Sequence, residues 1–138
     1  MGDYEDIKDE KRLLREPLVA YGSQNYFELA TQSIAKDKIK HVIKYTRLSL
    51  PEMIEIIPIS IDTYKRKQSF GPHVTEKVLE IEEVYKNGLK AFGAGFIDWM
   101  DTINPSLGSI KPKKLLANSF GIRRLLNEIG RMEYGILA

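Results

Sequence analysis

The chain has 138 residues, 43% of them hydrophobic and 29% charged, so it can bury a core but is too short for a large catalytic architecture. It contains no cysteine, which excludes disulfides, zinc fingers and thiol nucleophiles. The formal net charge of +2 is unevenly distributed, because residues 36–77 and 111–138 each sum to +4 whereas residues 1–35 and 78–110 each sum to −3.

The first segment, residues 1–35, is a charged lead-in. It begins with acidic and mixed-sign residues, where a secretory signal would begin basic and continue apolar. Nowhere do about 18 apolar residues follow one another, as a membrane-spanning helix requires. We therefore expect a cytoplasmic protein that does not enter a membrane, with a partly flexible lead-in outside the core.

From residue 36 onward, apolar residues recur at three- and four-residue spacings, so the predicted fold class is all-α, without strands. A first helix is expected over residues 36–48, with Asp37 in its first turn, where the helix dipole favours an anion. Ser49 has the features of an N-cap, and the short helix that it opens must end at Pro58. These elements begin a module that we assign to residues 36–73.

The second short helix of this module is expected over residues 61–68, capped by Ser60, with Ile61 and Tyr64 turned inward. Two short helices joined by a tight turn are typical of a helix-turn-helix, whose second helix enters the major groove of DNA. The candidate DNA-binding residues are Ser60, Thr63, Lys65, Arg66, Lys67 and Gln68.

A helical hairpin with a solvated basic face is the alternative interpretation of the same pattern. Two residues weaken the DNA interpretation. Pro58 stands where such turns usually carry glycine, and Asp62 places a negative charge beside the surface that would face phosphate.

A long helix over residues 74–93 is expected to connect this module to a C-terminal module over residues 94–138. In the second module, a short helix ends at Asn104-Pro105, Pro112 restarts a helix, and a last helix spans residues 120–134. Its core-facing residues are expected to include Phe96, Trp99, Ile122, Leu125, Leu126 and Ile129.

The run from Leu89 to Ala138 carries a continuous pattern of glycines, prolines and paired apolar residues. Its elements are Phe92-Gly93, Trp99-Met100, Asn104-Pro105, Leu107-Gly108, Pro112, Leu115-Leu116, Gly121, Leu125-Leu126, Ile129, Arg131 and Gly135. This pattern resembles the toxin-binding domain of Xre/MbcA/ParS-type antitoxins, with Met100 in place of the usual leucine and Ser109 in place of a second glycine. The stretch from Leu48 to Thr75 resembles the same family's Xre-like helix-turn-helix module.

The resemblance implies a type II antitoxin that binds and silences a partner toxin and represses its own operon. The implied partners are a RES-domain toxin that consumes NAD or transfers ADP-ribose from it, and operator DNA, bound weakly by the antitoxin alone. It further implies a homodimer within a larger hetero-oligomer. A stand-alone helix-turn-helix repressor without a toxin is the alternative.

The C-terminal end supplies the candidate toxin-binding residues: Arg123, Arg131, Gly135, Ile136, Leu137 and Ala138. The two arginines can offer charge-assisted donors, and the apolar tail that follows a helix stop at Gly135 can insert into a groove on another protein. The alternative is that the tail folds back to complete its own core.

Catalytic interpretations find little support in the sequence. The two histidines, His41 and His73, are not at metal-ligand spacing with another strong ligand, and Asp98 and Asp101 fit a solvated helix face. We therefore expect a protein that is not an enzyme and that carries neither a metal nor a cofactor.

Overall fold

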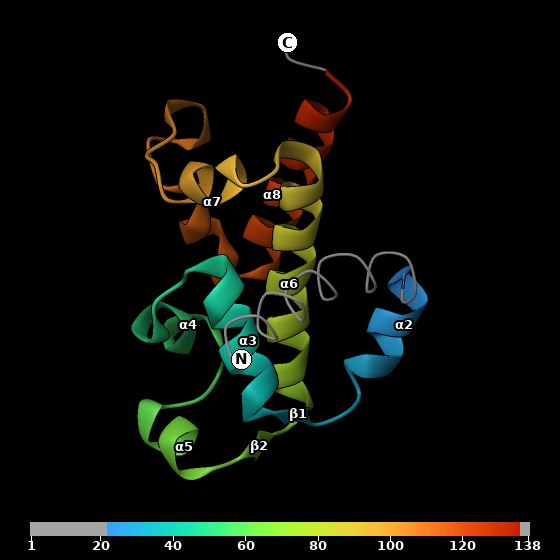
Figure 1. Ribbon diagram of the computed structural model, residues 1–138, viewed down its shortest axis with the longest axis vertical. Helices are drawn as coiled ribbons and strands as arrows, with labels where there is room; N and C mark the ends of the chain where they lie inside the picture. Colours follow the sequence, from blue (N-terminus) through green and yellow to red (C-terminus); the bar gives the residue numbers. More distant parts are fainter. Residues whose placement is uncertain (1–21, 136–138) are drawn as a thin grey trace, which may run out of the picture. The chain divides into compact units, whose positions relative to one another are not determined.

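The computed structural model of the protein describes residues 22–135, which are drawn in colour in Figure 1. The fold is mostly helical, so the predicted all-α class is confirmed. The chain divides into two compact units, Met1–Leu79 and Glu80–Ala138, and the boundary falls inside the long helix α6 (Pro72–Phe92). Within the described range, no helix has the length and hydropathy that crossing a bilayer requires.

The first unit contains regular structure within the stretch that the sequence assigns to a lead-in. Helix α2 (Gly22–Leu29) precedes strand β1 (Ile34–Ala35), and Ile34 belongs to the buried core. β1 pairs antiparallel with strand β2 (Ser69–Phe70), with Ile34 opposite Phe70. The expectation of a fold without strands is therefore wrong at this point, because two-residue strands show no alternation in the sequence. Residues 1–21 lie outside the described residues.

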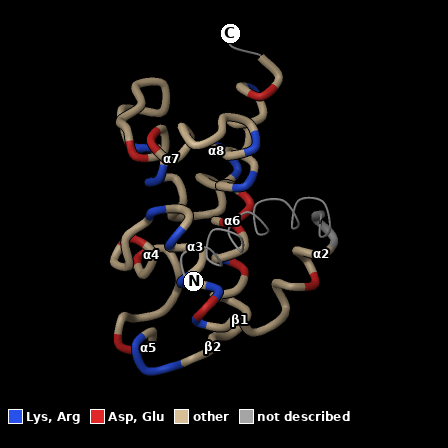
Figure 2. Tube along the Cα trace, viewed as in Figure 1, with Lys and Arg blue, Asp and Glu red and all other residues tan. Residues whose placement is uncertain are grey.

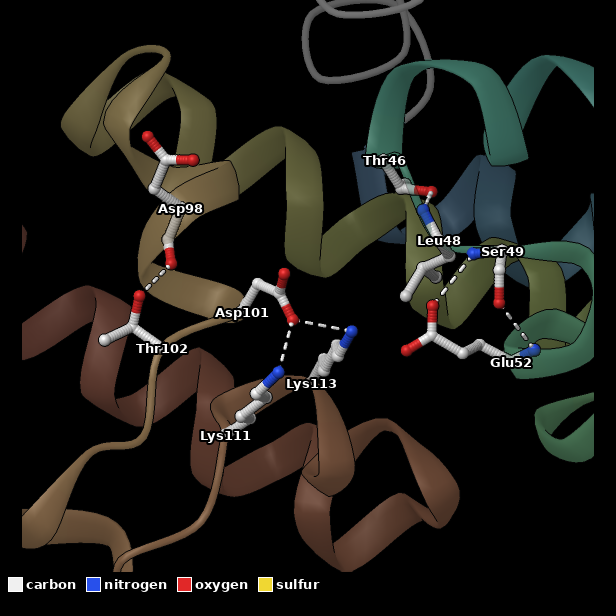
Figure 3. Close-up of polar contacts among 9 residues, drawn as sticks. All are labelled: Thr46, Leu48, Ser49, Glu52, Asp98, Asp101, Thr102, Lys111 and Lys113. Atoms are coloured by element: carbon white, nitrogen blue, oxygen red, sulfur yellow. Dashed lines mark hydrogen bonds and ion pairs between the residues drawn. The ribbon is translucent and has the colours of Figure 1, made fainter.

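Helix α3 (Lys36–Thr46) confirms the first predicted helix. At its end the hydroxyl of Thr46 donates to the carbonyl oxygen of Val42 at 2.7 Å and accepts from the backbone N–H of Leu48 at 3.3 Å, and the second of these bonds is drawn in Figure 3. Arg47 follows in the left-handed conformation, with a φ of 61°. This turn ends α3 and leads directly into the next helix.

Helix α4 (Leu50–Ile56) begins at the predicted cap. The Ser49 hydroxyl accepts from the backbone N–H of Glu52 at 3.2 Å, and the Glu52 carboxylate accepts from the backbone N–H of Ser49 at 2.9 Å (Figure 3). This reciprocal capping box satisfies two donors that a helix start leaves unpaired. The chain leaves the helix at Ile57, directly before Pro58, as the sequence predicts.

Helix α5 (Ile61–Arg66) is shorter than predicted. The Ser60 hydroxyl accepts from the backbone N–H of Thr63 at 3.1 Å, which confirms the cap. Tyr64 is buried and stacks on Phe70 with ring centroids 5.9 Å apart. Ile61, however, is 38% exposed rather than turned inward, because one buried aromatic fills the inner face of so short a helix.

Two apolar cores match the two units. Both draw on α6, whose residues up to Leu79 belong to the first unit and whose later residues belong to the second. The first core consists of Ile34, Ile39, Val42, Tyr45, Leu48, Met53, Ile57, Tyr64, Phe70, Val74, Val78 and Leu79. The second core consists of Ile81, Val84, Tyr85, Phe96, Met100, Leu107, Leu116, Ile122, Leu125 and Ile129.

In the second unit, helix α7 (Gly95–Met100) packs closely on α6. The buried ring of Phe96 meets Tyr85 edge to face, with centroids 5.5 Å apart. A side chain at Gly88 would overlap the Phe96 ring, so only glycine lets the two helices approach this closely. The 3₁₀ turns η2 (Pro105–Leu107) and η3 (Pro112–Ala117) follow. Helix α8 (Ser119–Glu133) ends the described chain.

Candidate functional site

Helix α8 is fixed at its first turn by two contacts. The side-chain oxygen of Asn118 accepts from the backbone N–H of Gly121 at 3.0 Å. Gly121 itself is buried, and a Cβ there would overlap the backbone carbonyl of Leu115 in η3. Gly121 therefore lets α8 pack directly on η3, and the two elements contact each other extensively. This contact sets which face of α8 points outward.

The predicted toxin-binding arginines lie on that outward face. Ile122, Leu125 and Ile129 are buried and Arg123 and Arg131 are exposed, as the sequence predicts, whereas Leu126, also predicted to face the core, is only half-buried. The Arg131 guanidinium lies 3.4 Å from the carboxylate of Glu128.

Gly135 has a φ of 69°, in the left-handed region that suits the residue after a helix end. It lies at the end of α8, two residues beyond Glu133. Ile136, Leu137 and Ala138, which complete the predicted toxin-binding set, lie outside the described residues.

Two aromatic residues on α8 were not singled out from the sequence. Phe120 is 77% exposed and Tyr134 is 78% exposed. The Arg123 guanidinium lies over the Phe120 ring, 5.5 Å from its centroid, so the ring and the cation form one surface feature. Figure 2 shows basic positions along α8 between its two ends. The spacing of Phe120 and Tyr134 around the arginines was the only signal in the sequence that could have revealed them.

The loop before η3 is held by an ion cluster. Asp101 lies 3.1 Å from the Lys111 ammonium and 2.7 Å from the Lys113 ammonium, as Figure 3 shows. The hydrogen bonds from Lys113 and then Lys111 lower the pKa of the Asp101 carboxyl below its ordinary value. Asp101 is exposed, as the sequence predicts, and its ion pairs connect the end of α7 to Lys111 and Lys113 on the other side of the loop.

The tip of the same loop turns through two left-handed residues. Gly108 has a φ of 86° and Ser109 a φ of 60°. Ser109 occupies the position where the resembled pattern carries a second glycine, and it adopts the conformation for which glycine is preferred. A backbone bridge between Asn104 and Ile110 closes the loop below this turn. Ser109 therefore adopts a backbone conformation that residues other than glycine rarely take.

Trp99 belongs to an aromatic stack at the end of α6 and along α7. Its ring stacks on Phe96 and on Phe92, with centroid separations of 5.6 and 6.4 Å. Phe96 is fully buried, whereas Trp99 is only partly buried and Phe92 lies at the surface. The expected core role of Trp99 therefore holds for one side of its ring.

Because α5 is short, some of the candidate DNA-binding residues lie in the helix and others lie at its ends or beyond it. Ser60 caps the helix, and its hydroxyl donates to the hydroxyl of Thr63 at 3.0 Å. Lys65 and Arg66 lie in the last turn, and the helix ends at Lys67. Gln68 therefore lies beyond the helix, which corrects the predicted span of 61–68. The side chains of all three basic residues are exposed, and so is the side chain of Asp62.

Lys36 attaches α5 to the start of α3. Its ammonium donates to the carbonyl oxygen of Lys65 at 3.1 Å and lies 4.9 Å from the centroid of the Tyr64 ring. Its backbone N–H donates to the carbonyl oxygen of Gln68 at 2.9 Å. Burial raises the pKa of the Tyr64 hydroxyl, and the nearby carboxylate of Asp37 raises it further. Lys36 was not identified from the sequence, because its partners lie about thirty positions away.

Nothing in the described residues suggests a metal or catalytic centre. Residues 22–135 contain no group of three or more histidine, aspartate or glutamate side chains that could hold a metal ion. Asp98 and Asp101, which lie one helical turn apart, make contacts of different kinds. The Asp98 backbone carbonyl accepts from the Thr102 hydroxyl, and the Asp101 side chain pairs with lysines (Figure 3).

A comparison with known protein families finds a match within the second unit. Residues 91–135 match the model of the antitoxin Xre/MbcA/ParS C-terminal toxin-binding domain. This match supports an antitoxin. The matched segment begins at the end of α6, contains α7, both 3₁₀ turns and α8, and stops at Gly135. Antitoxin domains of this family are generally not enzymes.

The matched segment contains the toxin-binding candidates Arg123, Arg131 and Gly135. The match covers about a third of the chain and leaves α3, α4 and α5 outside. No curated protein matches the chain.

Proposed function

We propose that the protein is the antitoxin of a type II toxin–antitoxin pair and that its second unit binds and neutralises a RES-type toxin in the cytoplasm. The observation that carries this proposal is the match of residues 91–135 to an antitoxin toxin-binding domain. The exposed arginines of α8 support it, because a site that handles an anionic dinucleotide or acidic side chains accepts charge-assisted donors. In this proposal, the residues that contact the toxin are Arg123, Arg131 and the chain end from Gly135 to Ala138.

Truncation after Tyr134 tests the proposed blocking role of the end of the chain. Under this proposal, the truncated protein should keep the melting temperature of the full chain but should fail to rescue cells that express the toxin. If residues 136–138 instead complete the core, truncation lowers stability first, by about 2–4 kcal/mol for two buried aliphatic side chains. Full rescue by a stable truncated protein would refute the blocking role.

We further propose that the first unit binds operator DNA weakly when the antitoxin is alone. The exposed cations Lys65, Arg66 and Lys67 support contact with phosphates, and Asp62 and the short α5 limit the affinity. Changing Lys65→Glu together with Arg66→Glu should abolish the shift of a promoter fragment, and binding by the unchanged protein should weaken steeply as salt rises. A double variant that still binds would move the DNA contact elsewhere.

A homodimer accompanies this proposal, because helix-turn-helix modules generally read paired half-sites with a two-fold protein. Light scattering of the purified protein at micromolar concentration should give twice the chain mass of 15.8 kDa. A clean monomer, both free and with toxin, is the result that counts against the dimer.

A further inference from the structure

The outward face of α8 combines features that a solvated helix face does not need. Six residues share this face, because each lies three or four positions from another member, and we name them the α8 stripe: Phe120, Arg123, Arg124, Asn127, Arg131 and Tyr134. All six are exposed. The two aromatic residues stand at the ends of the stripe, about 21 Å apart at 1.5 Å of rise per residue.

Exposed arginines alone are ordinary, but exposed aromatic rings at both ends of a charged stripe are not. Large aromatic side chains usually bury most of their surface, and aromatic and arginine residues are the types enriched at the centres of protein interfaces. Phe120 and Tyr134 leave more than three quarters of their surface open. The stripe therefore has the composition of a docking surface with two anchors.

The charges of the stripe select its occupant. Arg123, Arg124 and Arg131 lie between the two rings. Of the acidic residues of α8, Glu128 flanks the stripe, where its carboxylate pairs with Arg131, and Glu133 lies on the opposite side of the helix by helical position. The Arg123 guanidinium also lies against the Phe120 ring, so a partner that covers the ring meets a cation beside it. Such a surface complements an acidic protein face.

A second copy of this chain is a poorer occupant. In an antiparallel pairing of two α8 helices about Asn127, Arg123 of one copy would face Arg131 of the other, and a parallel pairing would place each arginine near its own counterpart. Like charges that face each other across an interface are unfavourable. The stripe therefore fits a different protein, not the dimer contact.

Gly130 adds a place where a partner can approach the helix backbone. It lies beside Arg131 on the edge of the stripe, and a Cβ built at this position meets nothing within 4 Å. A glycine in a helix interior costs stability, so its presence is easier to understand where a neighbouring surface comes close.

We propose that the α8 stripe docks onto an acidic surface of the toxin, with Phe120 and Tyr134 as anchors in two apolar pockets that flank it. This inference rests on the proposed antitoxin function and deepens it. It assigns the affinity for the toxin to a rigid helix face, in addition to the chain end beyond Gly135.

The test is a titration of the full-length protein against a purified RES-domain toxin, with Phe120→Ala and Tyr134→Ala as variants. Each should weaken binding by about tenfold or more, as truncation of an interface anchor does, and should leave the melting temperature unchanged because both side chains are exposed. Phe27→Ala is the matched control, because Phe27 is an aromatic residue of similar exposure, 75%, in the first unit. It should leave the affinity within about twofold.

A second pair of variants tests the charge of the partner surface. Arg124→Glu should slow association and weaken binding more strongly at low salt than at high salt, whereas Lys90→Glu, an exposed charge reversal on α6, should not. Toxin binding with unchanged affinity in the Phe120, Tyr134 and Arg124 variants would overturn the stripe and leave the proposed function standing. Loss of self-association in Phe120→Ala would overturn it in favour of a dimer contact. Failure of the unchanged protein to bind the toxin would overturn the proposed function and the stripe's partner together.

Discussion

At the scale of single residues, two glycines of the second unit have opposite roles. Gly121 is buried and its α-carbon faces the backbone of Leu115, so a methyl group there meets an atom that cannot move without moving η3. At Gly130, by contrast, an added methyl group would meet no other atom within 4 Å. The two positions lie in one helix, which makes them a controlled comparison.

We expect Gly121→Ala to lower the free energy of unfolding by about 1–3 kcal/mol or more, because overpacking against backbone forces α8 and η3 apart. Gly130→Ala should instead raise it by up to about 1 kcal/mol, through the better helix propensity of alanine. Chemical denaturation of the full chain measures both changes. Equal effects of the two substitutions would show that α8 does not pack on η3 as described.

The residues that cap and terminate helices were predictable from the sequence. Ser49, Ser60 and Pro58 act over one turn of chain, and the structure confirms the caps that Ser49 and Ser60 form. The exposure of Phe120 was not predictable, because an aromatic residue at a helix start is more often buried and the sequence does not show which neighbour would cover it. The same reason explains why Ile61 was wrongly placed inside.

At the scale of elements, α5 depends on residues distant in the chain. A helix of six residues leaves most of its backbone carbonyls without helical partners, and the Lys36 ammonium supplies a donor to one of them. Tyr64, which the same ammonium contacts, is fixed in turn by stacking on Phe70. The β1–β2 pair and this lysine together hold the segment after α4 in place.

Lys36→Met should therefore lower the free energy of unfolding by about 1.5–3 kcal/mol, the usual range for a hydrogen bond to a charged group. The loss should be local, with faster amide exchange over residues 63–68 than over α8. Exchange measured residue by residue on the full chain distinguishes this outcome. Lys40→Met, at an exposed position of the same helix, is the control and should change neither quantity.

The loop between α7 and η3 depends on charge. The pKa of Asp101 is lowered in the folded state, so its ion pairs stabilise the fold above the ordinary carboxyl pKa and are lost as the pH falls through the lowered value. We expect the melting temperature of the unchanged protein to fall more steeply below about pH 4 than that of Asp101→Asn. Thermal unfolding across pH 2–7 measures the difference between the two curves. Parallel curves would mean that Lys111 and Lys113 do not hold Asp101 in solution.

The α-helices of 11 residues or more were predictable because their apolar periodicity is repeated over several turns, as α3, α6 and α8 show. The contacts between segments that are separate in the sequence were not predictable. The pairing of Ile34 with Phe70 joins positions that no local pattern relates, and the lysines that hold Asp101 are identified only once the loop is folded. The candidate sites follow the same rule, since helical spacing predicted the exposed position of Arg123 and Arg131, whereas the contacts of Lys36 are identified only in the structure.

At the scale of the whole molecule, the basic charge is divided between the two units. Residues 36–77 and 111–138 hold the two basic segments, and each contains one of the proposed contact surfaces. The compact units meet inside α6, between Leu79 and Glu80, so each surface belongs to its own core. A substitution on the surface of one unit should therefore leave the fold of the other unchanged.

We expect the two proposed activities to be separable by mutation. The Lys65→Glu and Arg66→Glu double variant should lose operator binding but still rescue cells from the toxin, because its changes lie in the first unit on exposed side chains. Phe120→Ala with Tyr134→Ala should lose rescue but still bind the promoter fragment with the affinity and salt dependence of the unchanged protein. A variant with all four substitutions should lose both activities, and the effects of the two pairs should add, since distant sites without shared partners act independently. If either double variant loses both activities while its melting temperature is unchanged, the two surfaces are coupled, and DNA and toxin cannot be bound by independent units.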